Sequence, residues 1–315
     1  MKIGLIDVDG HNYPNLPLMK LSAYHKAKGD QVEWYDSWNG LFSPYDIVYL
    51  SKVFSFTKDY ELPIYAKEII RGGTGYCIEV INGKEIFHKE QNINLPEEIE
   101  HIYPDYSLYP EQTKDTAYGF LTRGCPRGCS FCIVKDKEGL CSHKVADLSE
   151  FWRGQKNIEL LDPNILACKE WEELLQQLID SKAKVNFNQG LDIRMMNEKK
   201  AEMLSQIPIK AIHFAWDRYE DKTLIQPKFL EFRRKSTIHP HALQVYCIVG
   251  DRERKLLSED LERIYWLRDN GFAPYVMIYE KNLLPKGHEL LKFQRYVNNR
   301  FVFWAVDNFE KYKGE

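Results

Sequence analysis

Residues 118–132 read YGFLTRGCPRGCSFC, a strand-like run followed at once by three cysteines. Cys125, Cys129 and Cys132 have the spacing C-x3-C-x2-C, and a glycine directly precedes each of the first two. Thiolates are the usual ligands of iron–sulfur clusters, and three of them can hold three irons of a four-iron cluster while the fourth iron stays open. Glycine lets the backbone turn tightly around such a cluster. The spacing therefore favours a [4Fe-4S] site.

Strand-like and helical stretches alternate from this point onward. The strand-like runs are Tyr118–Thr122, Ile158–Leu161, Lys184–Asn188, Ala211–Ala215, Gln244–Val249 and Tyr275–Tyr279. The stretches between them carry apolar residues at three- and four-residue spacing, which is typical of helices that pack on a sheet. We therefore predict an α/β fold with a six-stranded partial (βα) TIM-like barrel. In such barrels the loops after the strands form the active site.

The N-terminal region predicts a smaller α/β domain. Strand-like runs at Ile3–Asp7, Gln31–Tyr35 and Asp46–Leu50 accompany a helix-like stretch at Leu18–Lys28, and a further helix is expected over Tyr65–Ile70. We interpret this region as flavodoxin-like. The predicted domains are a small α/β domain with its linker at 1–112, the partial barrel at 113–282, and a C-terminal cap at 283–315.

Composition places the chain among ordinary globular proteins. Of its 315 residues 28% are charged and 44% are hydrophobic. The formal net charge is −3, so the chain lacks the excess of basic residues that would indicate binding to nucleic acid. The apolar runs are shorter than the roughly 20 residues that cross a bilayer, and the N-terminus lacks the features of a signal peptide. Seven cysteines, three of them clustered, suit a reducing compartment. We expect a cytoplasmic protein without membrane contact.

The cysteine loop resembles the signature of the radical S-adenosylmethionine superfamily. That signature is C-x3-C-x-aromatic-C after the first strand of a six-stranded partial barrel, and Phe131 occupies the aromatic position. The resemblance covers roughly Tyr118–Glu280. It implies that Cys125, Cys129 and Cys132 hold a [4Fe-4S] cluster and that S-adenosylmethionine binds to the open iron. It also implies an electron donor such as flavodoxin or ferredoxin, and a 5′-deoxyadenosyl radical that attacks an unknown substrate.

The loop after the second strand is a candidate for binding the ammonium of S-adenosylmethionine. The superfamily often carries Gly-Gly-Glu at this place, whereas this chain has Leu-Asp-Pro-Asn at residues 161–164. Asp162 could supply a carboxylate and Asn164 a neutral acceptor, because a cation that leaves water needs oxygen acceptors. The alternative for both residues is a helix N-cap, which Asp and Asn commonly provide.

The ends of later strands carry further candidates for cofactor binding. Asn188, Gln189 and Asp192 could bind the ribose hydroxyls or the methionine carboxylate, and Arg194 could pair with that carboxylate. A salt-bridged loop would explain the same residues without a ligand. The remaining candidates are Asp217 after the fourth strand, next to a tryptophan expected to pack, and Val249 at the end of the fifth, where the resemblance implies contact with adenine. No catalytic residue is predicted.

Two alternatives concern metals. The three cysteines could instead bind zinc in a non-catalytic recognition protein, with Cys141 or His143 as fourth ligand. The N-terminal domain resembles the cobalamin-binding domains that precede many radical S-adenosylmethionine barrels. Their histidine motif D-x-H-x-x-G is incomplete here, because Asp9 and His11 are followed by Pro14 in place of glycine. Cobalamin is therefore an option that we do not expect.

The use of the radical stays open at this point. A methyl or methylthio transfer and a rearrangement or oxidation are the two alternatives, and the incomplete cobalamin motif disfavours methylation. The stretch at 293–304 interleaves aromatic residues with Arg295 and Arg300, a pattern that suits stacked bases as well as a capping element. Nucleic acid is thus a minor alternative as a partner.

Overall fold

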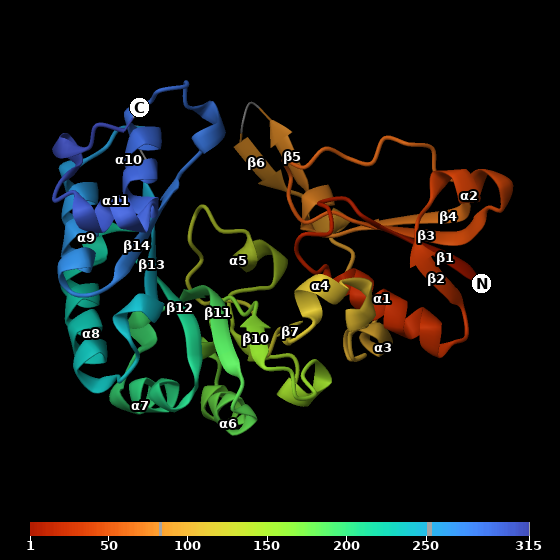
Figure 1. Cartoon of the computed structure of the whole chain (residues 1–315), viewed down its shortest axis with the longest axis horizontal. Coiled ribbons are helices and arrows are strands. Elements are labelled where there is room, and N and C mark those ends of the chain that lie inside the picture. Colours follow the sequence, from red (N-terminus) through yellow and green to blue (C-terminus); the bar gives the residue numbers. More distant parts are fainter. Residues whose placement is uncertain (82–83, 251–253, 315) are drawn as a thin grey trace. The chain divides into compact units, whose positions relative to one another are not determined.

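The computed structural model describes residues 1–81, 84–250 and 254–314 and divides the chain into two compact units (Figure 1). Unit 1 comprises Met1–Gly119, Arg127–Gly139 and Ala146–Lys156. Unit 2 comprises Phe120–Pro126, Leu140–Val145 and Asn157–Glu315. No described helix is both long enough and apolar enough to span a lipid bilayer. The domain boundaries expected from the sequence stay a prediction.

Unit 1 is built on a parallel sheet with strand order β2-β1-β3-β4. Its elements are β1 (Lys2–Asp7), α1 (Leu16–Ala27), β2 (Gln31–Trp34), α2 (Ser37–Phe42), β3 (Tyr45–Ser51), β4 (Ala66–Gly72), β5 (Ile78–Ile81), β6 (Lys84–Phe87), α3 (Glu97–Glu100), α4 (Pro110–Thr113), β7 (Thr116–Gly119) and α5 (Val134–Lys137). β5 and β6 pair antiparallel. The first three predicted strands and the first helix are confirmed.

The helix predicted over Tyr65–Ile70 is wrong. Residues 66–70 belong to β4, which pairs in parallel with β3 from Tyr45↔Ala66 to Ser51↔Gly72. The run AKEIIRG has helix-forming residues, but pairing along the edge of the sheet overrides that local preference.

The sheet of unit 1 buries apolar residues on both faces. Ile3 and Leu5 of β1 pack with Leu18 of α1, whereas Ile6 packs in a second cluster with Val48 of β3. Such two-sided burial is typical of parallel sheets and explains the continuous apolar run in β1.

Unit 2 carries most of a six-stranded sheet with the order β14-β13-β12-β11-β10-β7, to which it contributes β10 to β14. Its elements are β8 (Thr122–Arg123), β9 (His143–Lys144), β10 (Asn157–Leu160), α6 (Trp171–Ser181), β11 (Lys184–Leu191), α7 (Glu198–Gln206), β12 (Ile209–Ala215), α8 (Lys222–Lys235), β13 (Leu243–Val249), α9 (Ser258–Asp269), β14 (Ala273–Ile278), α10 (Glu289–Asn298) and α11 (Arg300–Ala305). All pairings from β10 to β14 are parallel. The predicted α/β class with a six-stranded sheet is confirmed.

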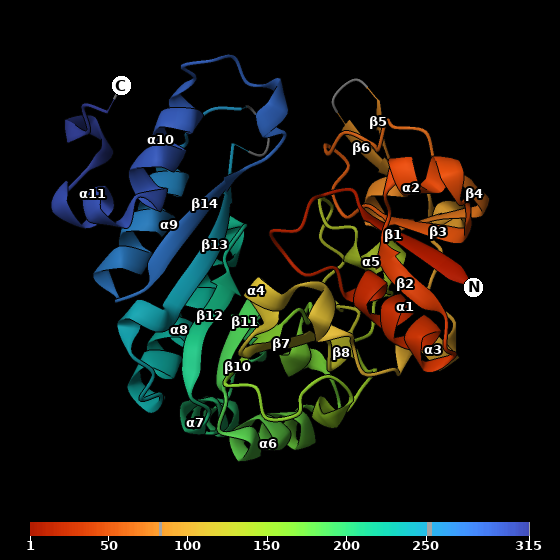
Figure 2. The ribbon, with the colours of Figure 1, turned by 45° about the vertical axis from the view of Figure 1, so that its right-hand side comes forward.

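The two faces of this sheet differ in polarity. Helices α6 to α9 lie along one side of strands β10 to β14 (Figures 1 and 2). In β11 Val185 and Phe187 are buried, while the alternate residues Asn186 and Asn188 are only partly buried. Because successive side chains of a strand point to opposite faces, β11 presents amides on the face opposite its apolar residues.

Helix α10 covers the outer edge of the sheet. The side-chain oxygen of Asn298 accepts a hydrogen bond from Val276 N at 2.7 Å, and the amides of Asn298 and Gln294 donate to Val276 O at 3.0 and 2.9 Å. These side chains satisfy backbone groups of β14 that have no further strand to pair with.

Candidate functional site

Asp162 holds the chain just before the first cysteine. Its side chain is only 3% exposed, and its carboxylate accepts hydrogen bonds from Leu121 N at 3.0 Å, Thr122 N at 2.7 Å and the Thr122 hydroxyl at 2.9 Å. Burial raises the pKa of Asp162 to about 6, although these hydrogen bonds act in the opposite direction. Both carboxylate oxygens are thus engaged, and contact with S-adenosylmethionine stays a prediction.

Asn164 contacts the first cysteine directly. Its side-chain nitrogen donates to Cys125 Sγ at 3.7 Å, and its backbone oxygen accepts from the Ser142 hydroxyl at 3.0 Å. The residue is 1% exposed, and its side-chain oxygen has no hydrogen-bond partner within residues 1–81, 84–250 and 254–314. Its side chain makes no capping hydrogen bond to the short 3-10 helix that follows. The N-cap alternative therefore does not account for Asn164.

The three cysteines are partly buried, and no disulfide links the described cysteines. Cys125 belongs to unit 2, whereas Cys129 and Cys132 belong to unit 1, where Cys132 N donates to Cys129 O at 3.1 Å. Gly124 and Gly128 have φ of +81° and +57°, so both positions need the left-handed backbone that glycine favours. No group of three or more His, Cys, Asp or Glu side chains within the described ranges could hold a metal. The cluster site stays a prediction.

The remaining residues of this segment have ordinary surroundings. Phe131, in the aromatic position, is 37% exposed. Cys141 donates to Ser142 O at 3.7 Å, and His143 Nδ1 lies 3.1 Å from Cys141 O. These contacts are made outside the three-cysteine motif.

Glu159 of β10 is a buried charge that the sequence reasoning missed. It is 6% exposed and accepts hydrogen bonds from the amides of Asn186 at 2.6 Å and Asn188 at 2.7 Å, and from Lys210 Nζ at 2.6 Å. The side-chain oxygen of Asn188 accepts a further bond from Asn186 at 2.7 Å. The available signal was an acidic residue between the apolar residues Ile158 and Leu160 of a strand. The predicted ligand Asn188 is part of this network.

A histidine and a tyrosine continue the polar face. The rings of His213 and Tyr246 stack with centroids 4.9 Å apart, and the Tyr246 hydroxyl donates to Asn188 O at 2.9 Å. His213 Nδ1 lies 2.7 Å from Phe187 O. Burial lowers the pKa of His213 and raises that of Tyr246 to about 12. Both side chains are therefore neutral near pH 7.

The loop after β11 is held by ion pairs. Asp192 is 6% exposed and accepts hydrogen bonds from Arg194 N at 3.1 Å and Arg194 Nε at 2.7 Å. A second guanidinium nitrogen of Arg194 donates to Asp221 at 2.7 Å, while Gln189 is exposed. The salt-bridged loop that the sequence left as an alternative is therefore present.

The predicted residues of the later strands lie in a well-packed region. Asp217 accepts from Ile248 N at 3.1 Å, and burial raises the pKa of its carboxyl. Trp216 is 1% exposed and packs edge-to-face against Trp266, with ring centroids 5.6 Å apart. The expectation that Trp216 packs in the core is confirmed. Val249 is also 1% exposed, so its side chain lies within the core rather than on an open surface.

In unit 1, His11 stacks on Trp34 with ring centroids 4.1 Å apart. Asp9 accepts hydrogen bonds from Phe54 N at 3.3 Å and the Thr57 hydroxyl at 2.6 Å. The two residues left from the incomplete cobalamin motif thus have structural contacts of their own.

Comparisons with known proteins bear on the fold. No protein-family model matches the chain. A CDK5RAP1-like protein from Oryza sativa subsp. japonica is 25% identical over 138 residues, which cover 40% of this chain and 23% of that protein. The structure of the cobalamin-dependent S-adenosylmethionine radical enzyme OxsB, with aqua-cobalamin and S-adenosylmethionine bound, matches 99% of this chain and 56% of that chain.

The OxsB match has a TM-score of 0.57 at 14% sequence identity, so it concerns the fold. The chain spans about a quarter of the length of the rice relative and somewhat more than half of the OxsB chain. Because the structural match covers nearly all of this chain, it includes both units. The resemblance expected from YGFLTRGCPRGCSFC is thereby confirmed at the level of the fold: the fold of this chain is similar to that of OxsB.

Proposed function

We propose that this chain is a radical S-adenosylmethionine enzyme in which Cys125, Cys129 and Cys132 hold a [4Fe-4S] cluster. In this proposal the six-stranded sheet forms the partial TIM-like barrel, and the four-stranded sheet of unit 1 forms the flavodoxin-like domain. The observation that carries the proposal is the C-x3-C-x2-C loop in a chain with this fold. When bound, the cluster would supply the electron that cleaves S-adenosylmethionine to methionine and a 5′-deoxyadenosyl radical.

The chemistry of the donor set suits such a cluster. Three thiolates on one loop are the expected ligands, and the Asn164 amide donates to one of them, Cys125. A hydrogen bond to a ligating sulfur stabilises its negative charge and raises the reduction potential of the centre. Asp162 fixes the backbone just before the loop through Leu121 and Thr122. Asp162 and Asn164 would together orient the first cysteine, Cys125.

Asn164 is also our proposed acceptor for the ammonium of S-adenosylmethionine. Its buried side-chain oxygen has no hydrogen-bond partner in the described part of the chain, and a buried carbonyl oxygen without a partner is costly. A cationic ligand would satisfy it. Asp162 has less capacity for this role because backbone and hydroxyl donors already engage both of its oxygens.

The decisive experiment is metal analysis and turnover of anaerobically purified protein. We expect roughly four irons with matching sulfide per chain, and 5′-deoxyadenosine with methionine by mass spectrometry after reduction in the presence of S-adenosylmethionine. Cys129→Ala should abolish this cleavage. Cys141→Ala, a cysteine substitution close by but outside the motif, is the matched control and should retain it. One zinc and no iron would instead establish the non-catalytic zinc protein.

Product analysis separates the possible uses of the radical. S-adenosylhomocysteine among the products would indicate methyl or methylthio transfer, whereas 5′-deoxyadenosine alone would indicate a rearrangement or oxidation. A flavodoxin or ferredoxin in a reducing, cytoplasmic compartment is the proposed electron source. The substrate itself is a separate question.

Cobalamin does not enter this proposal. OxsB is described as cobalamin-dependent, but the histidine motif is incomplete here and His11 stacks on Trp34. We derive no step through a corrin. Anaerobic incubation with hydroxocobalamin followed by gel filtration tests the point, because a corrin absorbance that co-elutes with the protein would require cobalamin to be added.

A further inference from the structure

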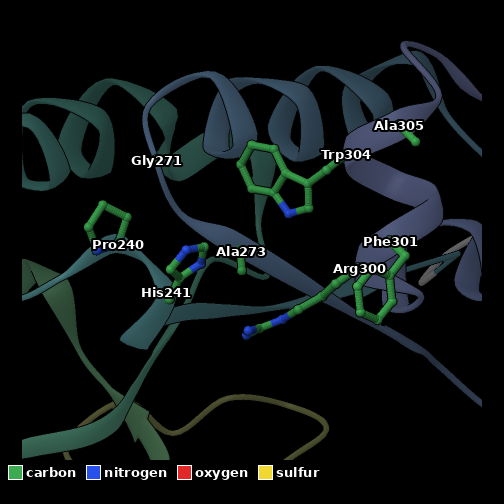
Figure 3. Close-up of a pocket in the computed structure, with 8 residues that line it drawn as sticks. All are labelled: Pro240, His241, Gly271, Ala273, Arg300, Phe301, Trp304 and Ala305. Carbon is green, nitrogen blue, oxygen red and sulfur yellow. The ribbon is translucent and has the colours of Figure 1, made fainter.

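A pocket in unit 2 lies at the N-terminal ends of β13 and β14, the opposite end of these strands from Val249. It has a volume of about 620 Å³, within the range of small-molecule sites. Its lining comes from the start of β14, from the residues before β13, and from α11 (Figure 3). The lining residues are Pro240, His241, Gly271, Ala273, Arg300, Phe301, Trp304 and Ala305.

Strand direction separates this pocket from the candidates at the other end of the sheet. Ala273 is the first residue of β14 and His241 precedes β13, whereas the candidate Val249 is the last residue of β13. A seven-residue strand spans roughly 20 Å at about 3.3 Å per residue. The pocket is therefore a site of its own within unit 2.

Among the residues that the structure describes, the lining of the pocket carries one fixed positive charge, on Arg300, and no negative charge. Its lining includes the Arg300 guanidinium and the His241 imidazole but no carboxylate. Within residues 1–81, 84–250 and 254–314, Arg300 makes no side-chain hydrogen bond or ion pair. Burial is the main cause of the lowered pKa of His213 on β12, and the positive charge of Arg300 lowers that pKa further. An anionic ligand would complement this charge.

Aromatic surface accompanies the charge. Arg300 and Trp304 are four residues apart on α11, so they lie on the same side of the helix. Figure 3 shows the Trp304 indole above the His241 and Arg300 side chains, with Ala273 of β14 between them in this view. Trp304 is 53% exposed and Phe301 90% exposed, so both rings offer faces to a ligand.

We propose that this pocket binds a nucleotide, with the base stacked on Trp304 and the phosphate paired with Arg300. A guanidinium pairs with phosphate through two parallel N–H groups. An indole accepts any base on its face, so stacking sets the class of ligand and not the sequence of a polymer. The pocket volume suits a mononucleotide, and the same chemistry would serve one nucleotide of a single strand.

Calorimetric titration of the full chain tests the proposal. The probe is guanosine 5′-monophosphate, chosen because it lacks the adenine that the proposed S-adenosylmethionine site would recognise. Guanosine should bind at least about tenfold more weakly, since it lacks the charge-assisted hydrogen bonds to phosphate. A single-stranded oligonucleotide is titrated in a separate experiment. If it binds more tightly than the mononucleotide, the ligand of the pocket is a nucleotide within a single-stranded polymer.

Variants assign the binding to the pocket. Arg300→Gln should reduce the affinity for guanosine 5′-monophosphate to the affinity for guanosine. Trp304→Ala should instead lower the affinity for both ligands about tenfold, because both stack their base on the indole. Arg295→Gln, on α10 outside the lining, is the matched control and should change neither. Absence of binding by both the monophosphate and the oligonucleotide overturns the proposal. It is also overturned if Arg300→Gln leaves the preference for the phosphate intact. Neither outcome involves the cluster.

Discussion

The loops after β10 and β11 were predicted to bind the same cofactor, yet they differ in how their polar groups are used. After β11, Asp192 and Arg194 pair with each other, and Arg194 also pairs with Asp221. After β10, Asp162 and Asn164 reach the segment that carries the first cysteine, and one amide oxygen keeps no partner in the described chain. Polar residues at a strand end therefore indicate a ligand site most clearly where their hydrogen-bonding capacity is not used internally.

The largest effect is expected from removing Asp162. Asp162→Ala leaves the buried donors Leu121 N and Thr122 N without their acceptor, and each unsatisfied buried group costs about 1–3 kcal/mol. We expect the free energy of unfolding, measured with urea, to fall by about 3 kcal/mol. Asp192→Ala, in the other loop, should cost about 1 kcal/mol. Equal losses would remove the contrast between the loops.

The next effect concerns pH. The pKa of Asp162 in the folded protein, about 6, lies above its ordinary value of 3.8, so the folded state binds this proton more tightly than the unfolded state. Its contribution to stability is present below pH 4 and is lost as the pH rises through about 6, by up to about 3 kcal/mol. Asp162→Asn should flatten this fall relative to the wild type. Unfolding curves from pH 4 to 7 measure it, and parallel profiles would contradict the raised pKa.

A smaller effect, on activity rather than folding, is expected from Asn164→Ala. Loss of the amide next to Cys125 and of the proposed ammonium acceptor should lower the rate of S-adenosylmethionine cleavage about tenfold, equivalent to about 1.4 kcal/mol. The iron content should stay near that of the wild type. Asn39→Ala, which removes an exposed asparagine of α2 outside the candidate site, is the control. A variant with full cleavage activity would mean that Asn164 acts on neither cysteine nor cofactor.

The smallest effect is expected from Arg194→Gln. Its ion pairs with Asp192 and Asp221 lie in a partly exposed loop, where such pairs contribute about 1 kcal/mol or less. We expect a decrease in unfolding free energy of that size and little change in the KM for S-adenosylmethionine. A large rise in KM would instead restore Arg194 as a ligand of the methionine carboxylate.

Much of the fold could be predicted from periodicity. Strands β10 to β14 and the first strands of unit 1 were recognisable because buried parallel strands carry many apolar residues. The predicted strand Tyr118–Thr122 overlaps only the end of β7, which runs from Thr116 to Gly119. The helix predicted over Tyr65–Ile70 is wrong because residues 66–70 belong to β4, an edge strand that pairs on one side only and retains helix-forming residues. Local propensity is a weak guide at such positions.

The candidate site was predictable only in its residue types. Asp162 and Asn164 were recognised from their place after a strand, but their hydrogen bonds to residues some 40 positions earlier are tertiary contacts that spacing does not encode. Glu159 was missed because the sequence does not show that Asn186 of β11 and Lys210 of β12 lie beside it and hydrogen-bond to its carboxylate. Hydrogen bonds and ion pairs between residues far apart in the sequence therefore cannot be predicted from a single sequence.

The amide side chains of Gln294 and Asn298 on the backbone of β14 have a consequence for how the protein behaves at high concentration. An open sheet ends in a strand that can template the addition of a strand from another molecule. With Val276 N and O already bonded to α10, that edge offers no continuous row of donors and acceptors to a second chain. The helix thereby lets the sheet stay open while it protects the protein from polymerising through that edge.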